Sequence, residues 1–422
     1  MKIVSLVMLL FLQGQMLLGQ VDYAKPIVKK LASKKFAGRG YVFGGDKKAA
    51  SFIASEFRKN GVLPLKGHYF QPFAMDANVF PKEVKVTLDN KKLSVGVNTL
   101  IEASSPSLRG RFEISKVSLQ KDTLFLRQLM NNPAYSGKII FVDEAVALEN
   151  MKADEFRMSL LYLAQGGLYK GILVDTKQKL LWRGATRQIQ RPIVYVKDVV
   201  TEGLPVKELD LNIYAKYQKD YKTNNVCGYI KGTSGSDSTV VITAHYDHVG
   251  AIGRNIIFPG ANDNASGTAL LLYLTKYYNA HPPKYNMVFL AFSGEESGLL
   301  GSIHFANNPQ IDLSKIKFLL NFDMAGTGDD GIQVVNGTVF KTEFDRLVQI
   351  NKEKSYLPQV LVRGPMNRSD HYPFYEKGVP SFFLYTLGGI GAYHDVYDRF
   401  ETLPFTKFDA YTQLMIDFIT TL

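Results

Sequence analysis

The chain has 422 residues, of which 46% are hydrophobic and 21% are charged, and its formal net charge at pH 7 is +11. This composition excludes a disordered chain and a fibrous repeat, and the length is sufficient for more than one domain with a buried core. The Lys and Arg residues are scattered and no nucleic-acid-binding signature accompanies them, so we expect no nucleic-acid partner.

The N-terminus combines one positive charge, Lys2, with the apolar run 3–12 and a following stretch that contains Gln and Gly. This pattern is typical of a signal peptide, which we place at residues 1–19. The run is too short to span a membrane, and no later run reaches about 18 apolar residues, so we expect no stable membrane anchor after cleavage. The sequence predicts a secreted protein, periplasmic or extracellular.

The next part of the chain, residues 23–73, predicts two helices separated by the glycine-rich turn Phe36–Gly40. Between residues 83 and 216 the pattern changes to short β-like runs separated by turns and one helical stretch. We interpret residues 83–216 as a smaller, β-rich inserted domain, called the insert below. Because no ligand-type residues converge in it, we expect a lid or substrate-access module whose removal would spare metal binding.

After residue 225, apolar strands alternate with amphipathic helices, which predicts an α/β fold with a mainly parallel central sheet flanked by helices. Residues 20–82 and 217–422 would together form this domain. A helix is expected from about 265 to 279. Continuous apolar runs, which suit central strands covered on both faces, predict four strands at 240–243, 287–292, 316–320 and 381–385.

Potential metal ligands follow each of these strands or the adjoining turn. In an open α/β sheet, ligands bind outside the carboxyl ends of the strands, so these side chains should converge. The candidates are His245, Asp263, Glu296, Asp323 and His394. Imidazole and carboxylate groups suit zinc, and a single cysteine excludes a site built on several thiolates. Two imidazoles and three carboxylates can hold two zinc ions if one carboxylate bridges them.

Residues adjacent to these candidates suggest further roles. Asp247 lies two residues after His245 and can orient its imidazole. Glu295 precedes Glu296, and two adjacent carboxylates can have different roles. One can bind metal while the other accepts the proton of the attacking water. His248 and His371 remain without an assigned role, because the ligand count requires neither.

The ordered set AHYDH, GANDNASG, FSGEESGLLGS, NFDM, SDHYPF and YHDVYD resembles the co-catalytic zinc aminopeptidase family, which also contains the glutamate carboxypeptidases and resembles the glutaminyl cyclases. The resemblance covers nearly all of residues 225–402, and the insert resembles a protease-associated domain. It implies specific roles for the matching residues: His245 and Asp323 on one zinc, Glu296 and His394 on the other, Asp263 bridging, Glu295 as general base and Asp247 behind the ligands.

The resemblance further implies a cis peptide bond after Asp263. One position departs from the family pattern, because Asp395-Val396 and then Asp398 follow the last ligand histidine, where the family commonly has Thr-Pro. The turn and the groups behind His394 should therefore differ from those of the family.

These features predict a metallo-exopeptidase that removes the first residue of peptides with a free N-terminus. Two alternatives on the same scaffold stay open at this point, a glutaminyl cyclase with a single zinc and a carboxypeptidase. A metal-free binding protein is a third, but such a protein should have lost ligands, and all five are present here.

Overall fold

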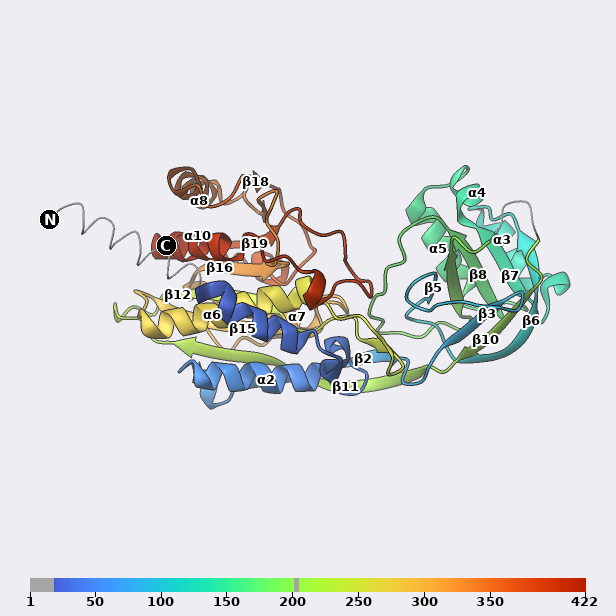
Figure 1. Ribbon diagram of the computed structural model, residues 1–422, viewed down its shortest axis with the longest axis horizontal. Helices are drawn as coiled ribbons and strands as arrows, with labels where there is room; N and C mark the ends of the chain where they lie inside the picture. Colours follow the sequence, from blue (N-terminus) through green and yellow to red (C-terminus); the bar gives the residue numbers. More distant parts are fainter. Residues whose placement is uncertain (1–18, 201–204) are drawn as a thin grey trace.

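The computed structural model describes residues 19–200 and 205–422, so the predicted signal peptide lies almost entirely outside the described residues. Two sheets organise the chain, a nine-stranded sheet flanked by helices and an eight-stranded sheet beside it (Figure 1). The strand β11 (Lys216–Ile230) and its antiparallel partner β2 (Phe70–Val79) run between the two parts. We call the nine-stranded sheet with its helices the main body.

The main-body sheet is parallel at its centre. Its strand order is β1-β11-β15-β12-β16-β19-β17-β18, with β2 also pairing with β11. Strand β12 pairs in parallel with β15 and β16, and β16 pairs in parallel with β19. The remaining bounds are β1 (Leu63–Pro64), β12 (Thr239–His245), β15 (Asn286–Phe292), β16 (Ile316–Asp323), β17 (Ile332–Val335), β18 (Val360–Val362) and β19 (Ser381–Thr386). The four predicted central strands and the predicted fold class are thereby confirmed.

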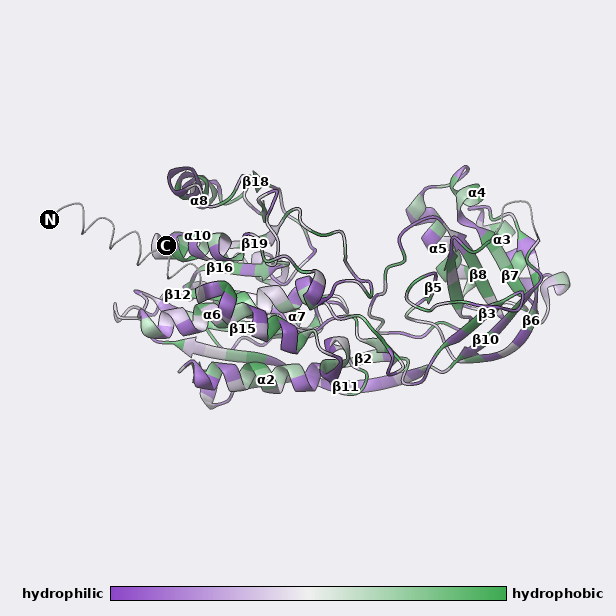
Figure 2. Ribbon diagram, in the orientation of Figure 1, coloured by the Kyte–Doolittle hydropathy of each residue, from purple (hydrophilic) through white to green (hydrophobic). Residues whose placement is uncertain are grey.

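Alternate residues of the central strands face two separate cores, as the two-residue period of a strand requires. Ile242 packs on one face, with helical residues 19–31, α2 (Gly45–Lys59), α6 (Gly267–Ala280), α8 (Lys341–Lys354) and α10 (Phe408–Thr420). Val241 packs on the other face, with α7 (Leu300–Asn307) and α9 (Tyr372–Tyr375). Hydrophobic residues line the strands of both sheets in Figure 2. The predicted helix at 265–279 corresponds to α6.

The insert contains the second sheet, in the order β4-β3-β10-β6-β7-β8-β9-β5. The runs that predicted strands form strands, but three helices occur where the sequence predicted one helical stretch. Their bounds are β3 (Lys85–Leu88), β4 (Lys91–Lys92), β5 (Thr99–Ile101), β6 (Leu108–Val117), α3 (Thr123–Asn131), β7 (Ile139–Asp143), α4 (Glu144–Leu148), α5 (Ala153–Leu163), β8 (Gly171–Thr176), β9 (Ile193–Lys197) and β10 (Glu208–Ile213). Helix α4 spans only five residues, too few for a helical period to show in the sequence.

The two parts of the chain share a hydrophobic core. Val249, Phe258 and Val396 of the main body pack with Trp182 and the strands of the insert. The division at residues 83 and 216, and the relation to a protease-associated domain, stay predictions. Short elements complete the fold: η1 (Lys34–Arg39), η2 (Leu65–Gly67), η3 (Pro133–Tyr135), β13 (Ala251–Ile252), β14 (Ile256–Ile257), η4 (Ala261–Ser266), η5 (Leu313–Lys315) and η6 (Phe400–Thr402).

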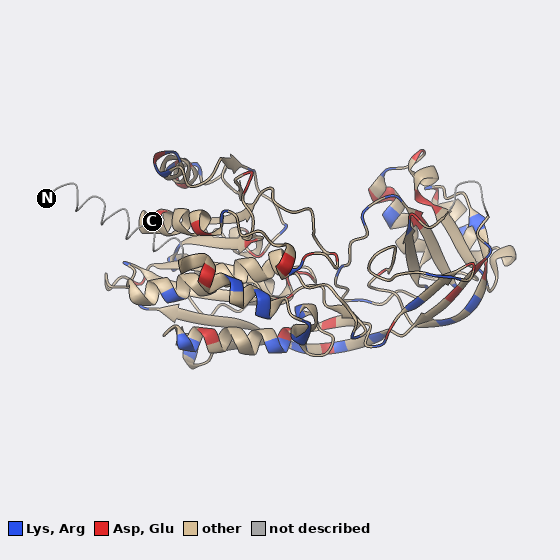
Figure 3. Cartoon of the chain, viewed as in Figure 1, with Lys and Arg blue, Asp and Glu red and all other residues tan. Residues whose placement is uncertain are grey.

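Charged residues are distributed over both parts of the chain, with Lys and Arg interspersed among Asp and Glu (Figure 3). Among the described residues, no helix has both the length and the apolar character that crossing a bilayer requires.

Candidate metal centre

The predicted ligands meet at the carboxyl ends of the central strands. His245 is the last residue of β12 and Asp323 is the last residue of β16. Glu296 lies in the loop after β15, His394 lies in the loop after β19, and Asp263 lies in the turn η4 that leads into α6. Because the central strands are parallel, segments separated by up to about 150 residues in the sequence end at the same edge of the sheet.

Asp263 lies between two groups of ligand-type side chains. Its Oδ1 atom is 3.4 Å from Nε2 of His245, which is also 3.3 Å from Oδ1 of Asp323. Its Oδ2 atom is 3.0 Å from Nε2 of His394, which is also 3.1 Å from Oε2 of Glu296. The two oxygens of one carboxylate therefore face two different imidazoles, which is the arrangement a bridging ligand needs.

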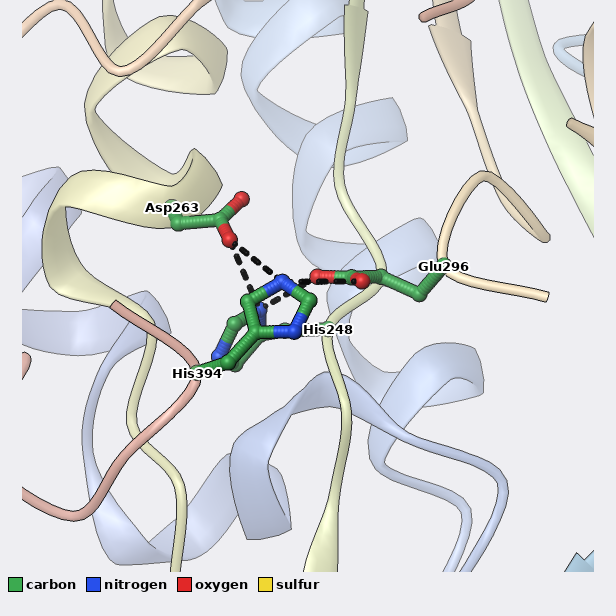
Figure 4. A group of neighbouring side chains, drawn as sticks. All are labelled: His248, Asp263, Glu296 and His394. Carbon is green, nitrogen blue, oxygen red and sulfur yellow. Dashed lines mark hydrogen bonds and ion pairs between the residues drawn. The ribbon is translucent and has the colours of Figure 1, made fainter. Parts of the chain in front are cut away.

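His248 belongs to the same cluster, although the sequence analysis left it without a role. Its Nδ1 atom lies 2.8 Å from Oε1 of Glu296 and 3.8 Å from Oδ2 of Asp263. Figure 4 shows the imidazoles of His248 and His394 beside these two carboxylates. His248 lies three residues after His245, and its place in the loop directly after β12 was the only available signal.

Asp247 contacts three groups around the ligands. Its main-chain oxygen is 3.2 Å from Nδ1 of His245, whereas its Oδ1 atom is 3.8 Å from that nitrogen. The carboxylate instead accepts hydrogen bonds from the Tyr41 hydroxyl at 2.7 Å and from the main-chain N–H of Glu295 at 3.2 Å. Asp247 therefore contacts the His245 imidazole through its main chain and the Glu295 loop through its side chain.

The turn that carries Asp263 is held by two residues that the sequence analysis did not select as site residues. Arg39 is fully buried and its guanidinium donates to five main-chain oxygens, including that of Asp263 at 3.0 Å. Asp398 accepts from the main-chain N–H groups of Asn262 at 2.8 Å and Asp263 at 3.0 Å. The peptide bond between Asp263 and Asn264 is cis, as the family resemblance implied.

The departure from the family pattern after His394 has a structural counterpart. Asp395 accepts hydrogen bonds from the main-chain N–H groups of Tyr397 at 2.8 Å and Asp398 at 3.1 Å through its Oδ1 atom. These bonds fold the loop back so that Asp398 reaches the Asp263 turn. In this chain, therefore, two aspartates organise the segment that follows the last ligand histidine.

The two adjacent glutamates have opposite electrostatic surroundings. Burial raises the pKa of Glu295 well above its ordinary value, and Glu296, Asp370 and Asp323 add to this shift while His245 opposes it. Burial also acts on Glu296, but the imidazoles of His394 and His248 outweigh it and hold the pKa of Glu296 well below its ordinary range. Glu296 is thus an ionised ligand-type group.

The Ser369-Asp370-His371 segment lies behind the site. Burial raises the pKa of Asp370 to about 7, and both of its carboxylate oxygens are buried without a hydrogen-bond partner among the described residues. Burial lowers the pKa of His371 to about 3, so this imidazole is neutral. Its ring packs 5.3 Å from that of Phe383. His371 is therefore a core residue.

The residues present fit divalent metal ions. Burying a carboxylate costs free energy unless the group is paired or coordinates a metal. The site brings together the buried carboxyl groups of Asp263, Glu295, Glu296 and Asp323, and bound metal ions would offset this cost. The donor atoms of His248, Asp263, Glu296 and His394 lie within 4.8 Å of one another, as do those of His245, Asp263 and Asp323. The only thiol, Cys227, is buried in β11, outside these groups.

Comparisons with known proteins bear on this site. Residues 225–419 match Peptidase family M28. A relative named aminopeptidase YwaD, from Bacillus subtilis (strain 168), is 25% identical over 345 residues, which cover 80% of this chain and 69% of the relative. A probable zinc metalloprotease from Pyrenophora tritici-repentis (strain Pt-1C-BFP) is 36% identical over 112 residues, which cover 26% of this chain and 23% of that protein.

Among solved structures, a Peptidase M28 precursor from Shewanella amazonensis SB2B superposes with a TM-score of 0.71 at 16% identity. The superposition covers 97% of this chain and 95% of that structure. At this identity the likeness shows a shared fold, which includes both sheets described above.

Proposed function

We propose, from the match of residues 225–419 to Peptidase family M28, that the chain is a zinc aminopeptidase with two metal ions. The observation that carries the proposal is the position of Asp263, whose two carboxylate oxygens face His245 and His394 separately. His245 and Asp323 would hold one ion, Glu296 and His394 would hold the other, and Asp263 would bind both. Zinc is the metal in the name of the fungal relative, and imidazole with carboxylate is a donor set that zinc accepts.

When bound, the two zinc ions would lower the pKa of a water molecule and polarise the scissile carbonyl group. Glu295 would accept the proton of that water and deliver it to the leaving amine. A carboxylate oxygen of Glu295 lies within 4.8 Å of ligand-type atoms of His245 and Glu296, which places it beside the proposed metal positions without requiring it as a ligand. Asp247 would hold the Glu295 loop through the hydrogen bond to its main-chain N–H.

The substrate class is proposed from the relatives and not from the charge of the site, because two bound divalent ions would neutralise the carboxylates that hold them. The Bacillus protein whose match covers 80% of this chain is named an aminopeptidase, and an aminopeptidase acts at a free N-terminus. We therefore propose peptides with free N-termini as substrates.

A set of synthetic peptides tests the proposed reaction. We expect release of the N-terminal amino acid from free peptides and none from the same peptides after N-acetylation. A chelator should abolish the activity, and added zinc should restore it. A peptide that begins with Gln separates the related activities, because an aminopeptidase releases glutamine whereas a cyclase releases ammonia. Release of the C-terminal residue, or of ammonia alone, would contradict the proposal.

We also propose that the protein is exported, on the basis of the apolar run at 3–12 behind Lys2. The mature N-terminus should then lie near residue 20. Sequencing of the N-terminus of protein purified from its native host tests this, and an intact Met1 would contradict it.

A further inference from the structure

We propose that the segment Lys179–Gly184 of the insert is a positioning element for the ligand histidine His394, with Trp182 as its anchor. Among the described residues, none of the side chains that form the candidate metal-binding groups belongs to the insert. It nevertheless supplies the hydrogen-bond partner of one of them. The inference rests on the proposed metal site, since it concerns how one of its ligands is held.

Two hydrogen bonds join Trp182 to His394 through main-chain atoms. The N–H of Trp182 donates to the main-chain oxygen of His394 at 2.8 Å, and the main-chain oxygen of Trp182 lies 2.9 Å from Nδ1 of His394. A carbonyl oxygen can only accept, so this contact places the imidazole proton on Nδ1. The lone pair is then on Nε2, the atom that lies 3.0 Å from Asp263 and 3.1 Å from Glu296.

The backbone of His394 also needs external support. Its φ angle is +50°, in the left-handed region that costs free energy for a residue with a side chain. The two hydrogen bonds between Trp182 and His394, one donated by each residue, hold both the main chain and the imidazole of His394. The same contact therefore fixes the backbone conformation, the tautomer and the orientation of the ring.

The indole of Trp182 attaches this segment to the main body. It is 4% exposed, stacks on Phe258 at 5.5 Å with an interplanar angle of 15°, and donates from Nε1 to the main-chain oxygen of Val249 at 2.9 Å. Val249 follows the His245–His248 segment, and Phe258 precedes the turn that carries Asp263. Trp182 thus fixes the position of His394 relative to the loops that carry the other ligands.

The ends of the segment make two further contacts with ligand-bearing loops. The Nζ atom of Lys179 lies 2.7 Å from Oδ2 of Asp395, next to His394. A Cβ atom on Gly184 would lie 3.1 Å from the main-chain oxygen of Glu296, so the segment approaches the glutamate loop closely. Under this proposal, removal of the insert should weaken the zinc site of His394, in contrast to the expectation from the sequence that metal binding would be spared.

Zinc titration of the metal-free protein tests the inference, with Trp182→Ala, Trp182→Phe and Leu160→Ala as variants. Trp182→Ala keeps the main-chain atoms that contact His394 but removes the indole that holds them in place. Loss of an outer partner of a metal-ligating histidine typically costs 10- to 100-fold in metal affinity, so we expect Trp182→Ala to weaken one zinc site by up to about that factor. The second site should change by less than about threefold. Trp182→Phe should recover most of the lost affinity, because the ring can still stack on Phe258.

Leu160→Ala is the matched control, because Leu160 is equally buried in the insert but packs in the core on the far side of its sheet. We expect it to lower the stability of the insert and leave both zinc sites unchanged. If it weakens one site as much as Trp182→Ala, the effect comes from general destabilisation and the inference is overturned. Unchanged zinc affinities in folded Trp182→Ala would also overturn it.

Should Trp182→Ala fail to fold, Trp182→Phe and Lys179→Met decide the question. Trp182→Phe removes the indole N–H donor, and Lys179→Met removes the ammonium group that contacts Asp395 and the main-chain oxygen of Gly391. Each variant should weaken the same single site by a smaller factor, and two unchanged variants would overturn the inference. The wild-type titration separates this outcome from failure of the proposed function. Fewer than two zinc sites in the wild type would contradict the two-metal proposal itself.

Discussion

Glu295 and Glu296 are neighbours in the sequence, but their side chains meet different groups. Both Glu296 oxygens lie near imidazoles, at 2.8 Å from His248 and 3.1 Å from His394. Within residues 19–200 and 205–422, no imidazole forms such an ion pair with Glu295, and burial raises the pKa of Glu295. The structure therefore separates a carboxylate suited to binding metal from one suited to exchanging a proton.

Paired substitutions test this division. Glu295→Gln keeps the size of the side chain and removes its basicity, and general acid–base catalysis typically contributes about 100- to 10,000-fold. We expect kcat to fall by that order while both zinc ions stay bound, and we expect Glu296→Gln to lose affinity for one zinc. Steady-state kinetics and zinc content, measured on both variants together, decide this. A Glu295→Gln protein with near-normal kcat would overturn the assignment, as would loss of zinc from it alone.

Arg39 illustrates a residue whose role depends on geometry and not on charge pairing. It donates to the main-chain oxygens of Leu31, Tyr246, Pro259, Gly260 and Asp263, and no carboxylate in the described part of the chain accepts from it. A lysine has three donors on one nitrogen and cannot reproduce the planar fork of an arginine. Several buried oxygens would then lack a partner.

We expect Arg39→Lys to lower the free energy of unfolding of the metal-free protein by at least about 2 kcal/mol, since each unsatisfied buried acceptor costs about 1–3 kcal/mol. Chemical denaturation measures this quantity. Arg254→Lys is the control, because Arg254 is exposed and lies over the Phe43 ring, and its effect should stay within about 0.5 kcal/mol. Equal effects of the two substitutions would contradict the role given to Arg39.

At the scale of elements, the first turn of α2 contains a buried carboxyl group away from the metal centre. Asp46 accepts hydrogen bonds from the hydroxyl groups of Tyr221 at 2.7 Å and Thr223 at 2.8 Å, which belong to β11. Burial raises its pKa from 3.8 to about 6, although these hydrogen bonds oppose the shift. Burial between α2 and β11 therefore favours the protonated form of Asp46, and it outweighs the hydrogen bonds, which favour the ionised form.

This shift predicts a pH dependence of stability. Because the folded chain keeps the Asp46 proton to a higher pH than the unfolded chain, the contribution of this group to the free energy of unfolding falls as pH rises from about 4 to about 6. A shift of about two pKa units corresponds to about 3 kcal/mol. The stability of Asp46→Asn relative to wild type should therefore rise over this range by up to that amount.

Denaturation of both proteins in the metal-free state measures the difference, and the titration of the metal ligands cancels in it. A relative stability that stays constant from pH 4 to pH 6.5 would contradict the raised pKa.

The elements also show what could be predicted from sequence. The four central strands were predictable because a parallel strand covered on both faces is apolar along its whole length, as β12 is. The convergence of their ends was predictable because parallel strands finish at one edge. His245, Glu296, Asp323 and His394 lie close together for this reason, and Asp263 joins them from the turn η4.

Other parts of the site had no such signal. Trp182 contacts His394 through main-chain atoms, and the two residues are 212 positions apart in the sequence. A main-chain contact does not require a particular residue type, so the sequence cannot reveal it. Arg39 was visible only as part of a glycine-rich turn, since carbonyl oxygens on distant segments are its partners. His248 was visible as a candidate, but only the fold shows that its imidazole reaches Glu296 and not the surface.

At the scale of the whole molecule, the two sheets form one functional unit. The shared core of Phe258, Val396 and Trp182 joins the insert to the main body at the metal centre. Lys179 and Trp182 extend this contact to the loop of His394. The main body thus brings the ligands together, and the insert helps to hold one of them.

The proposed division of ligands between two ions is the central claim, and anomalous diffraction at the zinc edge tests it most directly. Crystals of the zinc-loaded protein should show two peaks on either side of the Asp263 carboxylate, about 3.5–4 Å apart as in other two-metal sites. One peak should lie beside His245 and Asp323, and the other beside Glu296 and His394. A single peak at full zinc occupancy, or a second peak away from Asp263, would contradict the account.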